Sequence, residues 1–410
     1  MEGFGMRHAS FWLTILLALA TSGTAMAQTD ADAIYAQRLA ILTAGGPMET
    51  LYQPREPVAG APTALPAAQP GRTSIKPDAL TAARSYAEAS GAQAFIVWHD
   101  GKVQDETYFA GTNADTPLAS KSLSKPMTAM VVGRAIAMGK IKSLDQSVSD
   151  FITEWKGTPK EAMLIRHLLD MRTGFLEQGF NADPNHPWNQ AYLSVDHGTY
   201  IVKYYPLTDA PGTRYGYSNA TSELIALVIE RATGRRYAEF VGTELLIPTG
   251  APGGEVWVNR PGGLAHSGCC MMLPARAWLH LARLLLDDGM VGGKRLLPKG
   301  YVAEMATATA QNRHYGLGLW VAGPYVERRG FGAPGAPGPK VLHSEPYLDK
   351  DLFLFDGNGN QTVYVSRKTG LIALRMGPNP PKNVDWDNAY LPNTLLRGLV
   401  KPVTLVAQGK

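Results

Sequence analysis

The chain has 410 residues, of which 45% are hydrophobic and 18% are charged. This hydrophobic fraction is enough for a sizeable core, so the composition excludes an intrinsically disordered or collagen-like protein. The net charge of +4 comes from 39 basic and 35 acidic residues. No basic run accompanies it, which makes nucleic acid a poor candidate for a partner.

The N-terminus contains the three parts of a secretory signal. Arg7 precedes an apolar run over 11–20, and an A-x-A site follows at 25–27. The alternative is a membrane anchor, but a spanning helix needs about 20 consecutive apolar residues, and the polar Thr21 interrupts too early. We therefore expect cleavage after Ala27 and a periplasmic or secreted protein without stable membrane insertion.

The segment after the signal, residues 28–74, is rich in Ala, Pro and Gly and predicts an extended arm rather than a separate domain. A helix is predicted over Pro77–Ala89, because proline stands at its start and apolar residues recur at helical spacing. Residues 94–111 then predict a β-hairpin with its turn at 99–101.

The rest of the chain predicts helices followed by strands. A helix is expected from Ser122 to about Met138, and the stretch 140–300 is mostly helices and loops, with strong helices at Ser222–Thr233 and Ala275–Asp287. Strands are expected within 315–323, 352–366 and 370–377, and a last helix over Asn393–Leu399. Strands at both ends with helices between them favour an α/β (α+β) fold, in which one mixed, mainly antiparallel sheet takes strands from both termini and carries an inserted helical region.

The two cysteines are adjacent, Cys269 and Cys270. Two cysteines do not make a disulfide scaffold, and neighbouring residues are bridged only with strain. We expect both to be buried thiols in a small-residue packing site.

The most informative short motif is Ser122-Leu123-Ser124-Lys125 at the start of an apolar-periodic helix. A serine hydroxyl is a weak nucleophile and needs a base, and residues three apart lie on the same helix face. Lys125 could therefore reach Ser122 and act as its base if burial lowered the lysine pKa. The motif alone is weak, since the same four residues also describe a capped helix with a solvated lysine.

A second motif, Tyr217-Ser218-Asn219, lies in a glycine-bounded turn before a helix. A tyrosine near a lysine can relay protons, and an asparagine can hold a substrate carbonyl. Alone, this segment is more simply a loop whose tyrosine packs on the core.

Together with their context, the two motifs resemble the serine β-lactamase and penicillin-binding-protein superfamily. The resemblance runs from about Ala94 to Met376 and points to the class C-like branch with family VIII carboxylesterases and 6-aminohexanoate-dimer hydrolases. It implies a β-lactamase-like domain over 75–410, with Ser122 as the acylated nucleophile and Lys125 as its base. It also implies that Tyr217 relays the proton and that Asn219 contacts the substrate.

The third motif of this superfamily is usually K-T-G or H-x-G on a strand beside the serine, and the chain offers two candidates. Lys368-Thr369-Gly370 matches the letters but falls in an expected hairpin turn. We prefer Gly357-Asn358-Gly359-Asn360-Gln361, whose glycines would let the backbone approach the substrate and supply an oxyanion N–H. Without a lysine in that motif, the resemblance favours esters or simple amides over β-lactams.

Other site types have weaker support. The segment 216–220 nearly matches the G-x-S-x-G nucleophile elbow of α/β-hydrolases, but no buried strand precedes it. The nine histidines show no metal-binding spacing, and His167 is expected to be structural. Four aromatic residues before the second motif could line a substrate cleft or pack in the core: Trp188, Tyr192, Tyr204 and Tyr205.

The sequence thus predicts an exported serine hydrolase of small ester, amide or peptide substrates, working through an acyl-enzyme without metal or cofactor. Two alternatives remain open. One is a D,D-peptidase or β-lactamase acting on peptidoglycan peptides or β-lactams. The other is a non-catalytic binding protein on the same fold.

Overall fold

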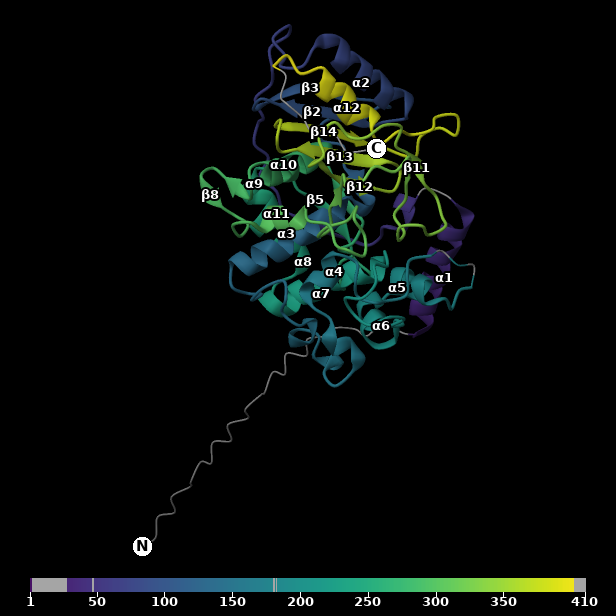
Figure 1. Cartoon of the computed structure of the whole chain (residues 1–410). Helices are drawn as coiled ribbons and strands as arrows, with labels where there is room; N and C mark the ends of the chain where they lie inside the picture. The colour runs from purple at the N-terminus through teal and green to yellow at the C-terminus, as the bar shows by residue number, and fades with distance from the viewer. Residues whose placement is uncertain (2–27, 46–47, 180, 182, 402–410) are drawn as a thin grey trace.

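A six-stranded antiparallel sheet forms the centre of the molecule, with helices on both of its faces (Figure 1). The computed structural model describes residues 1, 28–45, 48–179, 181 and 183–401. The expected signal segment therefore lies outside the described residues. Within the described part of the chain, no helix is long and apolar enough to cross a bilayer.

The strand order in the central sheet is β3-β2-β14-β13-β12-β9, and every pairing between these strands is antiparallel, in line with the expected mainly antiparallel sheet. The strands are β2 (Ala94–His99), β3 (Lys102–Tyr108), β9 (Trp320–Val321), β12 (Phe353–Gly357), β13 (Gln361–Ser366) and β14 (Leu371–Met376). The expected pairing of N-terminal with C-terminal strands is confirmed, because β2 pairs with β14 in the register Ala94↔Met376.

Alternating residues of the sheet enter two different cores. Along β2, Ile96 joins the larger hydrophobic cluster, whereas Phe95 and Val97 join the smaller one. This follows from the two-residue period of a strand. Both faces are apolar because α2 and α12 cover one face and α10 packs on the other.

The helices match most of the expected segments. The predicted helix Pro77–Ala89 is α2, with the same bounds, and the other long predicted helices begin or end within a few residues of their expected positions. The α-helices are α1 (Gln28–Ala44), α2 (Pro77–Ala89), α3 (Ser124–Ala137), α4 (Ile165–Leu169), α5 (Pro187–Leu193), α6 (His197–Tyr204), α7 (Asn219–Thr233), α8 (Tyr237–Val241), α9 (Ile247–Thr249), α10 (Ala275–Leu286), α11 (Tyr301–Met305) and α12 (Tyr390–Arg397).

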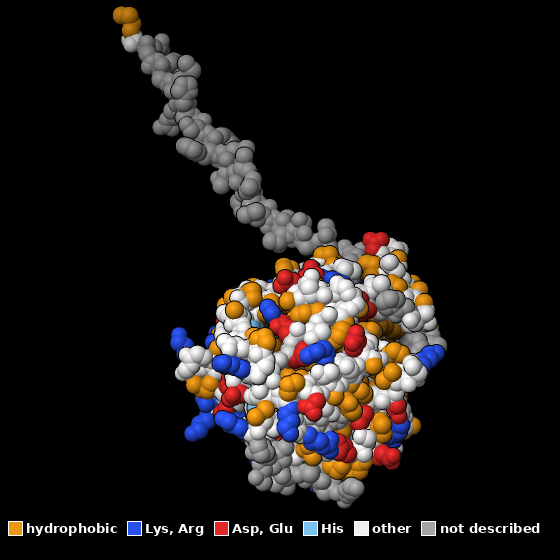
Figure 2. All heavy atoms as spheres, turned by 90° about the horizontal axis from the view of Figure 1, so that it is seen from above, with side chains coloured by type: hydrophobic (Ala, Val, Ile, Leu, Met, Phe, Trp, Pro, Cys, Tyr) orange, Lys and Arg blue, Asp and Glu red, His pale blue; other side chains and the backbone are white. Residues whose placement is uncertain are grey.

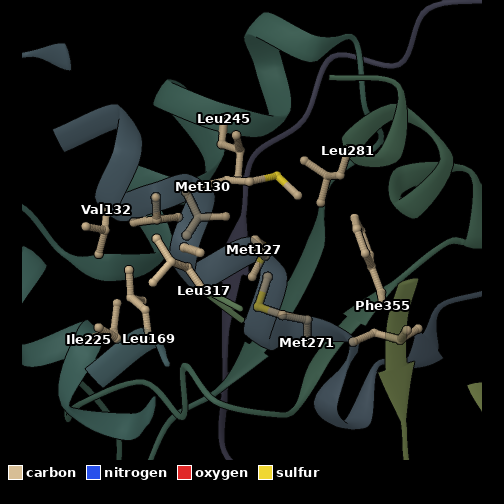
Figure 3. Packing of buried hydrophobic residues seen from close by; sticks show 14 of the residues in the cluster. Met127, Met130, Val132, Leu169, Ile225, Leu245, Met271, Leu281, Leu317 and Phe355 are labelled. Carbon is tan, nitrogen blue, oxygen red and sulfur yellow. The ribbon is translucent and has the colours of Figure 1, made fainter. Parts of the chain in front are cut away.

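The helical region packs around α3 and α7, beneath the sheet. Figure 3 shows Met127 and Met130 of α3 close to Leu281 of α10 and Phe355 of β12, which joins the helical region to the sheet in one core. Each of these four side chains is fully buried. The segment that carries the Ser122–Lys125 motif is therefore held between the sheet and the inserted helices.

The first part of the arm differs from the sequence prediction. Residues 28–44, expected to be extended, form helix α1, and a 3₁₀ turn η1 follows at Met48–Leu51. Helix α1 packs against α5, and apolar residues of both helices share one hydrophobic cluster. This tertiary packing stabilises the helix. The arm then adds strand β1 (Arg55–Val58) to a second sheet.

This second sheet has the order β1-β5-β6-β4. Its other strands are β4 (Leu118–Ala119), β5 (Gly254–Trp257) and β6 (Met271–Leu273). It ties the N-terminal arm to the segment before the serine motif. Two short hairpins complete the strands: β7 (Met290–Val291) with β8 (Lys294–Arg295), and β10 (Arg328–Arg329) with β11 (Val341–Leu342).

Acidic and basic side chains are interspersed on the face seen in Figure 2, without a large patch of one sign.

Candidate active site

Ser122 lies on a tight turn that neighbouring strands hold in place. The residue sits in the 3₁₀ turn η2 (Lys121–Leu123), directly after β4, and helix α3 begins at Ser124 rather than at Ser122. The Ser120 N–H donates to the carbonyl of Met271 (2.8 Å), and the Met271 N–H donates to Ser120 Oγ (3.0 Å). The Gln361 amide donates to the carbonyl of Ala119 (2.9 Å).

Lys125 reaches the serine as the spacing predicts. Its Nζ lies 3.1 Å from Ser122 Oγ, 2.8 Å from Asn219 Oδ1 and 2.9 Å from the carbonyl of Gly268. The side chain is only 2% exposed. Burial lowers the pKa of Lys125 to about 7 because the charged form loses its hydration, and the carboxylate of Glu223 opposes this decrease.

Tyr217 completes the group around Ser122. Its ring centroid lies 4.9 Å from Lys125 Nζ, and its hydroxyl is hydrogen-bonded to Ser122. Burial raises the Tyr217 pKa well above its usual value, so the phenol stays protonated near neutral pH. The ring packs against those of Trp320 and Phe331, which fixes its orientation.

Asn219 is the first residue of α7, and it positions Lys125 through its side-chain oxygen. Its own N–H donates to Gln178 Oε1 (3.0 Å). One helical turn further along α7 lies Glu223, the buried acid that faces Lys125. The sequence prediction missed Glu223 and the Gly268 carbonyl. The four-residue spacing from Asn219 was a signal for Glu223, because it places both on one helix face.

The glycine-rich segment Gly357–Gln361 lies against the turn η2 that carries Ser122. It joins β12 to β13, and Gly357 approaches η2 so closely that a Cβ there would stand 3.0 Å from the carbonyl oxygen of Ser120 and 3.1 Å from Leu123 N. Gly359 has φ +92°, a conformation that glycine adopts without strain. A side chain would therefore crowd the backbone at Gly357 and strain it at Gly359.

Within this segment the Gly359 N–H donates to Asn358 Oδ1 (3.0 Å), so a substrate oxyanion would have to replace this contact to use the same N–H. The other candidate motif lies elsewhere. Lys368 is exposed in the turn between β13 and β14. The length of β13, roughly 17–20 Å for such a strand, separates it from Asn360, which lines the cleft.

A cleft of about 650 Å³ opens beside these residues, within the usual size range of a small-molecule site. Of the four aromatic residues considered, Trp188 and Tyr192 line it, whereas Tyr204 is exposed on α6 and Tyr205 is buried in the core. The predicted site residues that line the cleft are Ser122, Tyr217, Asn219, Gly357, Asn358 and Gly359.

The other serines do not fit the role of nucleophile. Ser124 and Ser218 are fully buried, and Ser124 Oγ donates to the carbonyl of Lys121 (3.0 Å). No strand precedes Ser218 in the described residues 206–217, so the nucleophile elbow is absent from this segment. His167 is structural as expected, because its Nδ1 accepts from the Leu164 N–H (3.2 Å).

The two cysteines form a disulfide, which corrects the expectation of free thiols. Cys270 has φ +75°, and this left-handed turn brings the two adjacent side chains to the same side of the chain. Cys269 lines the cleft and directly follows Gly268, the carbonyl partner of Lys125. The Tyr192 hydroxyl lies 3.7 Å from both sulfurs.

A buried cluster behind Lys125 contains the possible metal ligands His197, Glu223 and His266, with ligand atoms within 4.8 Å of one another. The two imidazole rings are stacked at 4.0 Å with an angle of 13° between them, and Trp257 stacks on the other side of His266. Lone pairs of parallel rings do not converge on one point, so this arrangement does not fit a metal site. Burial keeps the pKa of both histidines well below the usual value, which makes the stack neutral.

Residues 81–388 match the beta-lactamase family. The chain belongs to the beta-lactamase family. Over 226 residues it is 27% identical to the 6-aminohexanoate-dimer hydrolase of Paenarthrobacter ureafaciens, an alignment that covers 52% of this chain and 57% of the relative. The aligned part is thus somewhat more than half of that relative.

Solved structures show the same fold at lower identity. A Bacillus anthracis protein provisionally named a 6-aminohexanoate-dimer hydrolase superposes with a TM-score of 0.64 at 19% identity, covering 81% of this chain and 87% of that chain. A family VIII carboxylesterase superposes with a TM-score of 0.56 at 17% identity, covering 79% and 98%. The predicted β-lactamase-like fold is confirmed.

Proposed function

We propose that the protein is an exported serine hydrolase that cleaves carboxylic esters or small linear amides through an acyl-enzyme on Ser122. The observation that carries this proposal is the 3.1 Å contact between Lys125 Nζ and Ser122 Oγ in a buried site beside the cleft. A lysine with a pKa near 7 is partly neutral at physiological pH and can accept the serine proton.

The reaction would proceed in two steps. Neutral Lys125 takes the Ser122 proton as Oγ attacks the substrate carbonyl, and backbone N–H groups at the cleft hold the oxyanion. Tyr217, hydrogen-bonded to Ser122, gives its phenolic proton to the leaving alcohol or amine as the bond to the carbonyl carbon breaks, and the proton held by Lys125 replaces it. Water then attacks the acyl-enzyme, Lys125 takes a proton from this water and returns it to Ser122 Oγ, and the acid is released.

The preference for esters and simple amides rests on the third motif. The segment Gly357–Gln361 brings no lysine to the cleft, and Lys368 is exposed at the other end of β13. The comparison with a 6-aminohexanoate-dimer hydrolase supports a linear amide, and the fold shared with a family VIII carboxylesterase is compatible with an ester. Export rests on the signal in residues 2–27 and would give a mature N-terminus at Gln28.

A fluorophosphonate probe tests the nucleophile. Ser122→Ala should abolish labelling, whereas the matched variants Ser124→Ala and Ser218→Ala should keep labelling at Ser122. Labelling that survives in folded Ser122→Ala would refute the proposal. Turnover of nitrophenyl esters, 6-aminohexanoate dimer, D-Ala-D-Ala peptides and nitrocefin then ranks the substrate classes, and we expect the first two to lead.

A further inference from the structure

The N-terminal arm forms one wall of the cleft that contains Ser122. Leu42 of α1, Met48 of η1 and Tyr52 all line this cleft, although they precede the serine by about seventy residues or more in the sequence. Trp188 and Tyr192 of α5 continue the same wall. We call these five residues the arm wall.

The arm wall is held rigidly against the rest of the molecule. Arg38, only 5% exposed, donates to the carbonyls of Leu193 (2.9 Å), Gln53 (2.9 Å) and Asn259 (2.8 Å). Three carbonyls from three different segments are thus joined by one side chain. Since a buried guanidinium is costly unless its donors are paired, this arrangement indicates a fixed position for α1.

The residue next to the nucleophile is also attached to the arm. Lys121 Nζ forms an ion pair with Glu49 Oε1 of η1 (2.6 Å) and lies 3.3 Å from the Tyr52 hydroxyl. This pairing neutralises the Lys121 charge at the edge of the arm wall. The surface that remains toward the cleft is aromatic and aliphatic: Trp188 and Tyr192 are stacked at 5.3 Å, and Leu42 and Met48 are partly exposed.

A second part of the cleft lining is more polar and adjoins Tyr217. It includes Asp356 and Arg329 as well as Asn358, and the Tyr217 ring packs against Phe331 on this side. The leaving group must lie near Tyr217 to receive its proton, so this part of the lining faces the leaving group. Tyr217 packs in one hydrophobic cluster, whereas the aromatic residues of the arm wall pack in another, so we place the acyl group against the arm wall.

Building on the proposed function, we infer that the arm wall is the acyl-binding site and that it selects substrates with an apolar, aliphatic or aromatic acyl group. Each buried methylene would then raise kcat/KM by up to about fourfold until the wall is covered. The N-terminal arm is a specificity element of the active site and not a linker.

Nitrophenyl esters from acetate to octanoate test this inference. In the wild type, kcat/KM should rise with acyl length. In the double variant Leu42→Asn/Met48→Gln, which keeps side-chain size but adds polar groups, the octanoate-to-acetate ratio should fall about tenfold or more; a ratio that stays at the wild-type value would overturn the inference. Gln37→Ala, an exposed position on the same helix, is the matched control and should leave the ratio unchanged.

Two further measurements keep the outcomes separate. A series of alkyl acetates with growing alcohols should show no change of slope in the double variant; a changed slope there would overturn the assignment to the acyl side. Labelling by a small fluorophosphonate reports on Ser122 in every sample. An enzyme that is labelled but shows no acyl-length preference overturns this inference alone, whereas absent labelling and turnover overturn the proposed function as well.

Discussion

Replacing Glu223 with glutamine should move the acidic limb of acylation to lower pH. In the proposed mechanism the neutral form of Lys125 is the base, so acylation should fall about tenfold per pH unit below the Lys125 pKa of about 7. The Glu223 carboxylate stabilises the ammonium and holds this pKa higher than burial alone would. Removing its charge therefore lowers the pKa further, by roughly one unit for a charge at this range in a buried site.

The expected size of the effect follows from the neutral fraction. At pH 6, a lysine of pKa about 7 is about 9% neutral, and one of pKa about 6 is about half neutral. Relative to its own plateau, Glu223→Gln should thus acylate faster than the wild type at pH 6, by up to about fivefold. The gain stays below this limit because burial raises the pKa of Glu223 itself to about 7, so its carboxylate is only partly ionised at pH 6. Acylation rates by stopped flow between pH 5 and 9 measure this directly.

Apart from Lys125, the titratable groups that face Glu223 are neutral over this pH range, so they should not shift the acidic limb. Burial lowers the pKa of His197 and His266 and raises that of Tyr192 and Tyr237. Glutamine also keeps the size of the side chain and leaves the three hydrogen bonds of Lys125 intact. An acidic limb that stays in place or moves upward, in a variant of unchanged fold, would refute the electrostatic role of Glu223.

Three other predictions test the site and the core. Lys125→Arg should lower acylation at pH 7 by about a thousandfold or more, since a guanidinium keeps its proton; near wild-type acylation would exclude lysine as the base. Gly359→Val should lower kcat/KM at least tenfold, because this position has a positive φ and close neighbours. Lys368→Ala should change kcat/KM by no more than a few-fold. The reverse order of the two effects would show that the third motif was misassigned. Ile225 is fully buried on α7 and labelled in Figure 3. Ile225→Ala should lower the free energy of unfolding, measured by urea denaturation, by about 2–5 kcal/mol. A loss below about 1 kcal/mol would show that neighbouring side chains fill the space left by the deleted atoms.

Local patterns in the sequence were sufficient for much of the fold. The helix Pro77–Ala89 and the hairpin of β2 and β3 follow from proline placement, apolar periodicity and a glycine turn, all of which act within a few residues. The pairing of Lys125 with Ser122 was also predictable, because a spacing of three brings two side chains together in any helical turn.

Only the tertiary structure decided the features that depend on distant segments. Helix α1 packs against α5, whereas the Pro- and Gly-rich stretch later in the arm, over 54–72, predicted an extended conformation for the whole of 28–74. Likewise, Gly268 and Glu223 acquire their relation to Lys125 when α3, α7 and the segment before β6 come together. The pKa of a lysine depends on the solvent that those segments exclude, and no local pattern in the sequence encodes that exclusion.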